Sequence, residues 1–229
     1  IENLRIVGVT KEETPEVYDT FMEYTTKAYA SEKSPLELSF IPIHPGDILS
    51  YGGYHFEVKL LKGHTFGQCG LYEPEKKLMF VGDQLMTTIV PIVGTQETDL
   101  GMLKCYLDSL GDLKHNYKDC YFLPCHYGEI KNVEKEVNRI ILGYLEKCEI
   151  MKHVLEEAGT ALTTRDIGVR TYGRSQGPPD YAHFASCTYI WAKTFSCMEY
   201  MMGEGFVERS ERDGIIYWKA PSIHFENNR

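Results

Sequence analysis

The sequence lacks the features that define several large classes of proteins. No apolar run approaches the roughly 20 residues that cross a bilayer as a helix, and no secretory signal pattern is present. Internal repeats and low-complexity tracts are also missing. The seven cysteines show no paired spacing, which favours scattered thiols in a reducing compartment over a disulfide framework. We therefore expect a cytoplasmic protein with no membrane association.

Positive charge is scarce as well. The chain has 24 Lys and Arg against 33 Asp and Glu, a net charge of −9. Such a balance disfavours general affinity for nucleic acid, although it leaves room for a local basic patch. A small-molecule substrate is the expected partner, and homo-oligomerisation is left open. With 229 residues, of which 43% are hydrophobic, the chain can form one large domain or two small ones.

Apolar periodicity predicts a mixed α/β N-terminal part. Apolar spacing and end signals indicate helices over residues 14–30, 97–110 (closed by Gly111) and 133–157 (closed by Gly159). Strands are predicted within residues 47–60, 78–81 and 121–123. The run LMFV at 78–81 is continuous and apolar, which is typical of a strand buried on both faces.

The pattern changes after Gly159. TTRDIGVRTYG predicts a short helix with a threonine cap, and a second helix is expected over residues 182–202. FVERSERDGIIYWKA predicts a hairpin turned at Asp213-Gly214. Helices followed by a β-wing are typical of a winged-helix module. The wing mixes basic with acidic residues, so packing or dimerisation is favoured over DNA binding.

Three residues stand just past the ends of predicted strands. His64 lies in GHTFG, Asp83 follows the run LMFV-Gly, and His126 follows the strand at residue 121. Side chains at such positions converge on one edge while the sheet holds their backbones rigid. Imidazole and carboxylate are common ligands of Zn²⁺ and related cations. Singly, each residue is better explained as a turn former or an ordinary histidine, but their combined order favours a metal site.

The same segments carry a family resemblance. GHTFGQCGLYEPEKKLMFVGDQL resembles the metallo-β-lactamase superfamily signature, a Gly-His-Thr-x-Gly turn followed by an apolar strand and Gly-Asp. PGDILSYGGYHFEV is similar to the strand pair that precedes this turn. PCHYGEI is similar to the later Pro-Gly-His-Gly motif, with Cys125 and Tyr127 in place of glycines. The resemblance spans about residues 36 to 130.

This resemblance implies a fold, a site and a reaction. The fold would be an αββα sandwich, incomplete at its N-terminus, over residues 1–130, followed by a mainly helical winged-helix domain over 131–229. His64 would bind one metal ion, His126 would bind the second, and Asp83 would bridge both and serve as the catalytic carboxylate. The two divalent ions would be zinc, with iron or manganese as alternatives. Metal-bound hydroxide would hydrolyse a thioester, another acyl ester or a phosphodiester.

The family's first ligand motif, His-x-His-x-Asp-His, does not occur in the sequence. The chain is therefore expected to be a fragment of a longer enzyme, with a degenerate, non-catalytic interaction or regulatory protein as the alternative. On its own it should bind metal weakly or not at all and be inactive. A half-open sandwich should also expose apolar sheet surface.

Two rival motifs are weaker. Residues 173–177, GRSQG, match the G-x-S-x-G nucleophile pattern but lack the strand before it and the helix after it that the pattern requires. Cys120 and Cys125 beside His126 would suggest structural zinc only with a second Cys/His pair, and none has suitable spacing. Cys125 as a modulator of the metal and Tyr127 at the substrate entrance are left open.

Overall fold

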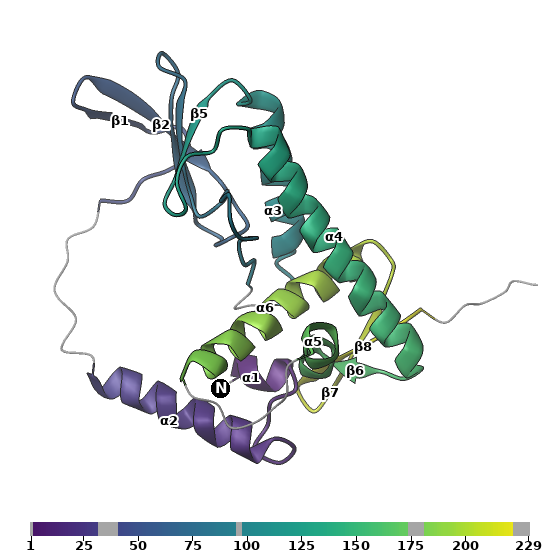
Figure 1. Cartoon of the computed structure of the whole chain (residues 1–229). Coiled ribbons are helices and arrows are strands. Elements are labelled where there is room, and N and C mark those ends of the chain that lie inside the picture. Colours follow the sequence, from purple (N-terminus) through teal and green to yellow (C-terminus); the bar gives the residue numbers. More distant parts are fainter. Residues whose placement is uncertain (1, 32–40, 95–97, 174–180, 222–229) are drawn as a thin grey trace, which may run out of the picture. The chain divides into compact units, whose positions relative to one another are not determined.

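The computed structural model describes residues 2–31, 41–94, 98–173 and 181–221, and Figure 1 shows its elements. The chain forms two compact units. One comprises residues 31–145, and the other combines residues 1–30 with residues 146–229. The division differs from the predicted boundary at residue 130. The first 30 residues belong with the C-terminal unit, and helix α4 (Val133–Ala158) runs through the boundary because its first turns complete the core of the sheet unit.

The unit of residues 31–145 contains one sheet with helices beside it. Its strands stand in the order β1-β2-β3-β4-β5. All neighbours are antiparallel except β4 and β5, which are parallel. Its elements are β1 (Ile48–Tyr51), β2 (Tyr54–Leu60), β3 (Cys69–Glu73), β4 (Leu78–Gly82), α3 (Met102–Asn116), β5 (Tyr121–Pro124) and the first part of α4.

Helix α3 differs from its prediction at both ends. It begins after Gly101, which has a left-handed φ of 57°, and continues through Gly111 to Asn116. A glycine inside a helix costs about 1 kcal/mol relative to alanine. Leu110 and Leu113, which flank Gly111, are fully buried, and burial of two such side chains stabilises by more than that cost. Packing therefore overrides the stop signal.

The two faces of the sheet differ. Met79 and Val81 on β4 are fully buried, whereas Phe80 between them is 40% exposed. The prediction that LMFV is buried on both faces is therefore wrong for the described residues. Leu71 on β3 and Leu123 on β5 are paired with Phe80 and share its face, and the rings of Phe80 and Phe56 meet edge to face at 5.8 Å.

The exposed face is apolar, as expected for half of a sandwich. Besides Phe80, it includes Tyr54 and Leu60, each 40% exposed, and Tyr121, 45% exposed. Residues 41–145 contribute a single sheet, so the second sheet of the predicted sandwich is not among the residues described for this unit. Figure 1 shows α3 and α4 on one side of the sheet.

The other unit is mainly helical. Its three strands form a separate sheet in the order β6-β8-β7. The elements are α1 (Glu2–Ile6), α2 (Pro15–Ser31), the remainder of α4, β6 (Leu162–Thr163), α5 (Thr164–Tyr172), α6 (Tyr181–Gly203), β7 (Glu208–Arg212) and β8 (Ile215–Lys219). The helices predicted over 14–30 and 182–202 and the hairpin at Asp213-Gly214 are confirmed. The assignment as a winged-helix module stays a prediction.

Aromatic and aliphatic packing forms the core of this unit. Trp218 on β8 is fully buried, meets Phe195 edge to face at 5.6 Å and donates from its indole nitrogen to Thr164. Leu4, Val9 and Trp191 form a second buried cluster. Across the described residues, no helix is long and apolar enough to span a membrane.

Candidate metal centre

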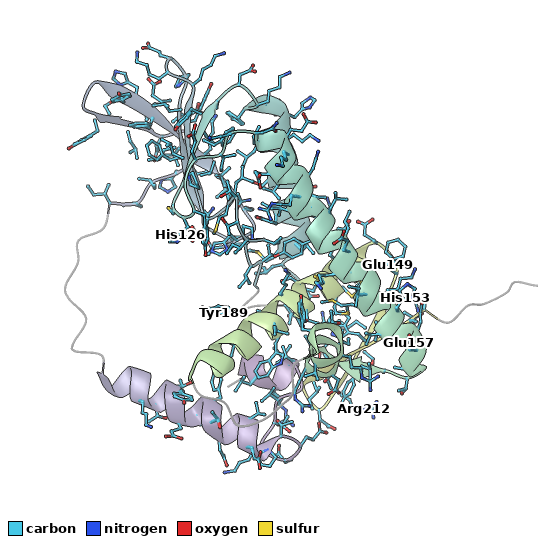
Figure 2. All side chains as sticks on the ribbon, viewed as in Figure 1. His126, Glu149, His153, Glu157, Tyr189 and Arg212 are labelled. Carbon is cyan, nitrogen blue, oxygen red and sulfur yellow. The ribbon has the colours of Figure 1, made fainter. Side chains whose placement is uncertain are left out.

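His64, Asp83 and His126 come together at one edge of the sheet. Strand β2 is antiparallel to β3, and β3 is antiparallel to β4, so β2 runs in the same direction as β4 and β5. The three residues follow the carboxyl ends of β2, β4 and β5, and parallel ends of this kind meet at one edge. His126 lies there, beyond the strands (Figure 2). The structure thus brings the three side chains to one edge, and their role as metal ligands stays a prediction.

The carboxylate of Asp83 lies between the two imidazoles. Its Oδ2 is 3.7 Å from Nε2 of His64, and its Oδ1 is 3.4 Å from Nε2 of His126. Both distances exceed the 2.7–3.2 Å of an N–H···O hydrogen bond. Oδ1 is buried and has no hydrogen-bond partner among the described residues. An unsatisfied buried acceptor costs about 1–3 kcal/mol, so this oxygen is well suited to a cation.

The ring of His64 is held in one tautomer. Its Nδ1 lies 2.7 Å from the carbonyl oxygen of Ile92. Because a carbonyl can only accept, this hydrogen bond places a proton on Nδ1, and in the neutral ring the lone pair is then on Nε2. That lone pair is near Oδ2 of Asp83, and two such acceptors repel unless a cation or a proton lies between them. This is the donor arrangement of a metal-binding histidine whose outer nitrogen is held by a backbone carbonyl.

The site is incomplete as a cation cage. Within the described part of the chain, no group of three or more His, Cys, Asp or Glu side chains is placed to hold a metal ion. Asp83 instead makes two separate pairs, one with each histidine. The donor chemistry fits zinc or a related cation, and one carboxylate oxygen toward each imidazole fits a bridge between two cations. Further ligands would be required to complete either coordination sphere.

Gln84 connects the loops that carry His64 and Asp83. Its side chain is fully buried, donates to the carbonyl of Lys62 at 3.0 Å, and accepts from the amide of Gln68 at 3.3 Å. Its own carbonyl accepts the hydroxyl of Tyr106 at 2.8 Å. Burial raises the pKa of Tyr106 and keeps this hydroxyl a neutral donor. The two loops are thus fixed to each other and to α3.

Sequence reasoning missed Ile92, Gln84 and Tyr106. Ile92 acts through a backbone carbonyl, and a carbonyl leaves no signal in residue type. Tyr106 has the apolar spacing of any core residue of α3. Gln84 gave the one available signal, because an amide side chain directly after a candidate ligand, followed by the apolar pair Leu85-Met86, suggests a buried polar contact.

Residues beside His126 also differ from the family motif. Cys125 is an exposed free thiol. Tyr127 is 55% exposed and has a φ of 67°, a left-handed conformation that favours glycine. Its carbonyl accepts the hydroxyl of Thr87 at 3.1 Å, which holds the turn. Glycine, which the Pro-Gly-His-Gly motif has at this position, adopts this conformation without strain. In this chain the hydrogen bond from Thr87 helps to hold Tyr127 in it.

The rival motifs gain no support. Gly173 ends α5 in a left-handed conformation with φ of 63°, and residues 174–177 of the G-x-S-x-G match lie outside the described residues. Cys120 is partly buried, which raises the pKa of its thiol and disfavours the thiolate that binds zinc.

Comparisons with known proteins give the fold class. No family model matches the chain. The structure is similar to a metallo-β-lactamase family protein from Thermus thermophilus, with a TM-score of 0.66, 20% identity, and coverage of 88% of this chain and 65% of that one. It is also similar to a β-lactamase domain protein from Burkholderia ambifaria, with a TM-score of 0.76, 18% identity, and coverage of 94% and 60%. The chain thus has a mixed α/β fold similar to that of these metallo-β-lactamase structures, and the described residues of the sheet unit form one sheet of it.

One curated protein matches over a short segment. The chain is 50% identical over 40 residues to hydroxyacylglutathione hydrolase GloC of Haemophilus influenzae, which is 18% of this chain and 19% of that protein. The chain therefore matches less than two thirds of the length of this relative, and the same holds for both similar structures.

Proposed function

We propose that this chain is part of a metal-dependent hydrolase of the metallo-β-lactamase superfamily. The observation that carries the proposal is the carboxylate of Asp83, which lies between His64 and His126 with one buried oxygen lacking a hydrogen-bond partner among the described residues. A buried carboxylate oxygen would normally accept a hydrogen bond from a protein donor. The fold supports the same conclusion.

The residues would divide the work as follows. Nε2 of His64 and Nε2 of His126 would each hold one divalent ion, with Asp83 between the two; zinc is favoured, with iron or manganese as alternatives. When bound, such ions act as Lewis acids and lower the pKa of water toward about 7. Asp83 would also accept a hydrogen bond from the attacking water and so orient it toward the substrate carbon.

The substrate class follows from the curated relative. Candidate substrates are thioesters, other acyl esters and phosphodiesters. The relative is named a hydroxyacylglutathione hydrolase, and an acyl group carried on the thiol of glutathione is a thioester. Thioesters are therefore the favoured class. A non-catalytic scaffold is not favoured, because the curated protein that matches is itself named as an enzyme.

The remaining ligands would come from residues beyond those described. Three side chains cannot fill the coordination spheres of two ions, and the described residues contain no group of three or more His, Cys, Asp or Glu side chains placed to hold one. We therefore propose that the 229-residue chain alone binds metal weakly and is inactive, whereas the product of the complete gene binds two ions and acts on a small molecule in the cytoplasm. Homo-oligomerisation is left open.

Elemental analysis and a substrate panel test the proposal. The product of the complete gene should hold divalent metal and hydrolyse thioesters faster than phosphodiesters. Asp83→Asn and His126→Gln should each lower the metal content and reduce kcat/KM by about 100-fold or more. The control is His153→Gln, where His153 pairs with Glu149 and Glu156 and lies on α4 with Glu149 (Figure 2); this variant should keep both metal and rate. Full activity and metal content in Asp83→Asn would refute the proposal.

A further inference from the structure

The side chain of Tyr144 on α4 ends at a backbone segment next to the candidate metal centre. The residue is fully buried. Its hydroxyl donates to the carbonyl of Pro91 at 2.6 Å and accepts the amide N–H of Val93 at 2.9 Å. One hydroxyl thus joins two positions of the chain on either side of Ile92, and both hydrogen bonds are buried.

The N–H of Val93 and the carbonyl of Ile92 belong to the same peptide group. In a trans peptide these two groups point in opposite directions. Because the hydroxyl of Tyr144 holds the N–H, the carbonyl is directed away from Tyr144, and it accepts Nδ1 of His64 at 2.7 Å. A continuous path of two hydrogen bonds and one rigid plane therefore runs from Tyr144 to His64.

We propose that Tyr144 is a positioning residue for the metal centre. Its hydroxyl orients the peptide between Ile92 and Val93 so that the carbonyl fixes the proton of His64 on Nδ1 and leaves Nε2 available to a metal ion. Metal-binding histidines depend on such outer contacts for their tautomer and ring orientation. The inference rests on the proposed function only in assigning a metal ion to Nε2 of His64. The tautomer of His64 does not depend on any metal.

The alternative is that Tyr144 serves only as a packing residue. Its ring meets that of Tyr106 edge to face at 5.9 Å, and this contact does not need the hydroxyl. Tyr144→Phe keeps the ring and removes the two hydrogen bonds, so it separates the two roles.

Nitrogen-15 NMR spectra of the histidine side chains test the proposal in the metal-free 229-residue chain, at a pH where imidazole is neutral. His64 is assigned by its loss in His64→Gln. We expect a dominant Nδ1–H form in the wild type and a shift of the population toward Nε2–H in Tyr144→Phe. One control, Tyr172→Phe, should keep the wild-type spectrum, because it removes a buried hydroxyl with no hydrogen-bond partner among the described residues.

An unchanged Nδ1–H population in folded Tyr144→Phe overturns the proposal. If Tyr144→Phe does not fold, two measurements on the wild-type chain test the proposal instead. Slow hydrogen exchange of the Val93 amide together with the Nδ1–H form supports the proposal, and fast exchange of that amide or a dominant Nε2–H form overturns it. In the complete gene product, Tyr144→Phe should lower zinc affinity about tenfold. If no zinc binds while the tautomer responds as expected, the proposed function fails and the positioning role stands.

Discussion

Gly63 allows the loop that carries His64 to pack closely against helix α3. It has a φ of 141°, and a Cβ atom built there would lie 2.4 Å from Cβ of Tyr106 and 2.5 Å from its Cα. The loop that carries His64 therefore packs directly against the backbone of α3. No side chain fits between them, because the obstructing atoms include main chain that cannot turn aside.

Gly63→Ala should therefore destabilise the chain strongly. We expect a loss of about 2 kcal/mol or more in the free energy of unfolding, since the variant combines a backbone clash with a strained φ. Urea unfolding followed by circular dichroism measures it. Gly67→Ala, in the same loop, is the control: nothing lies within 4 Å of its added Cβ, and a change within about 0.5 kcal/mol is expected. Equal midpoints for the two variants would contradict the packing described.

The candidate ligands could be predicted at this scale, but their supports could not. His64, Asp83 and His126 have residue types and positions that indicate metal binding. Their convergence required only that β2, β4 and β5 run in the same direction. Ile92 contributes only a backbone carbonyl. Tyr144, which holds the neighbouring Val93, lies more than fifty positions away in the sequence. No local pattern encodes such a contact.

At the scale of elements, local signals placed most helices and strands correctly. They failed where packing outweighed propensity, as in α3, which continues through Gly111. They also missed β6, whose two residues pair with Trp218 and Tyr217 of β8. A two-residue strand has no periodicity to detect. It forms because β8 provides backbone hydrogen-bond partners for it. The apolar run in β4 predicted a strand correctly but not its exposed face, since burial depends on what covers the sheet.

The cap of α5 is one local signal that can be tested. The hydroxyl of Thr163 accepts the amide N–H of Asp166 at 3.1 Å. Thr163→Ala should lower the free energy of unfolding by about 1 kcal/mol, the usual value of a lost N-cap, and hydrogen exchange of the Asp166 amide should accelerate. Thr20→Ala in α2 is the control, because this exposed hydroxyl donates within its own helix, to the backbone carbonyl of Glu16. Unaltered exchange at Asp166 would show that the cap contributes little.

For the whole molecule, the main feature is the uneven cover of the five-stranded sheet. Met79, Val81 and Phe122 are buried on one face. The opposite face presents Phe80 and Tyr54, each 40% exposed, with Leu60 and Tyr121 on the same face.

This patch should bind a hydrophobic dye. We expect the chain to enhance the fluorescence of anilinonaphthalene sulfonate, and Phe80→Lys to reduce that enhancement several-fold by placing a charge in the patch. Ile150→Lys on α4 is the matched control, since Ile150 is 41% exposed but belongs to the other unit. The same fluorescence in both variants would mean that the dye binds elsewhere.

The most direct test of the account is the location of bound metal. Crystals of the complete gene product grown with zinc should give anomalous difference peaks at the zinc absorption edge. The account predicts peaks within about 2.0–2.2 Å of Nε2 of His64, Nε2 of His126 and the carboxylate of Asp83. Peaks elsewhere, with these three side chains bound only to water, would contradict it.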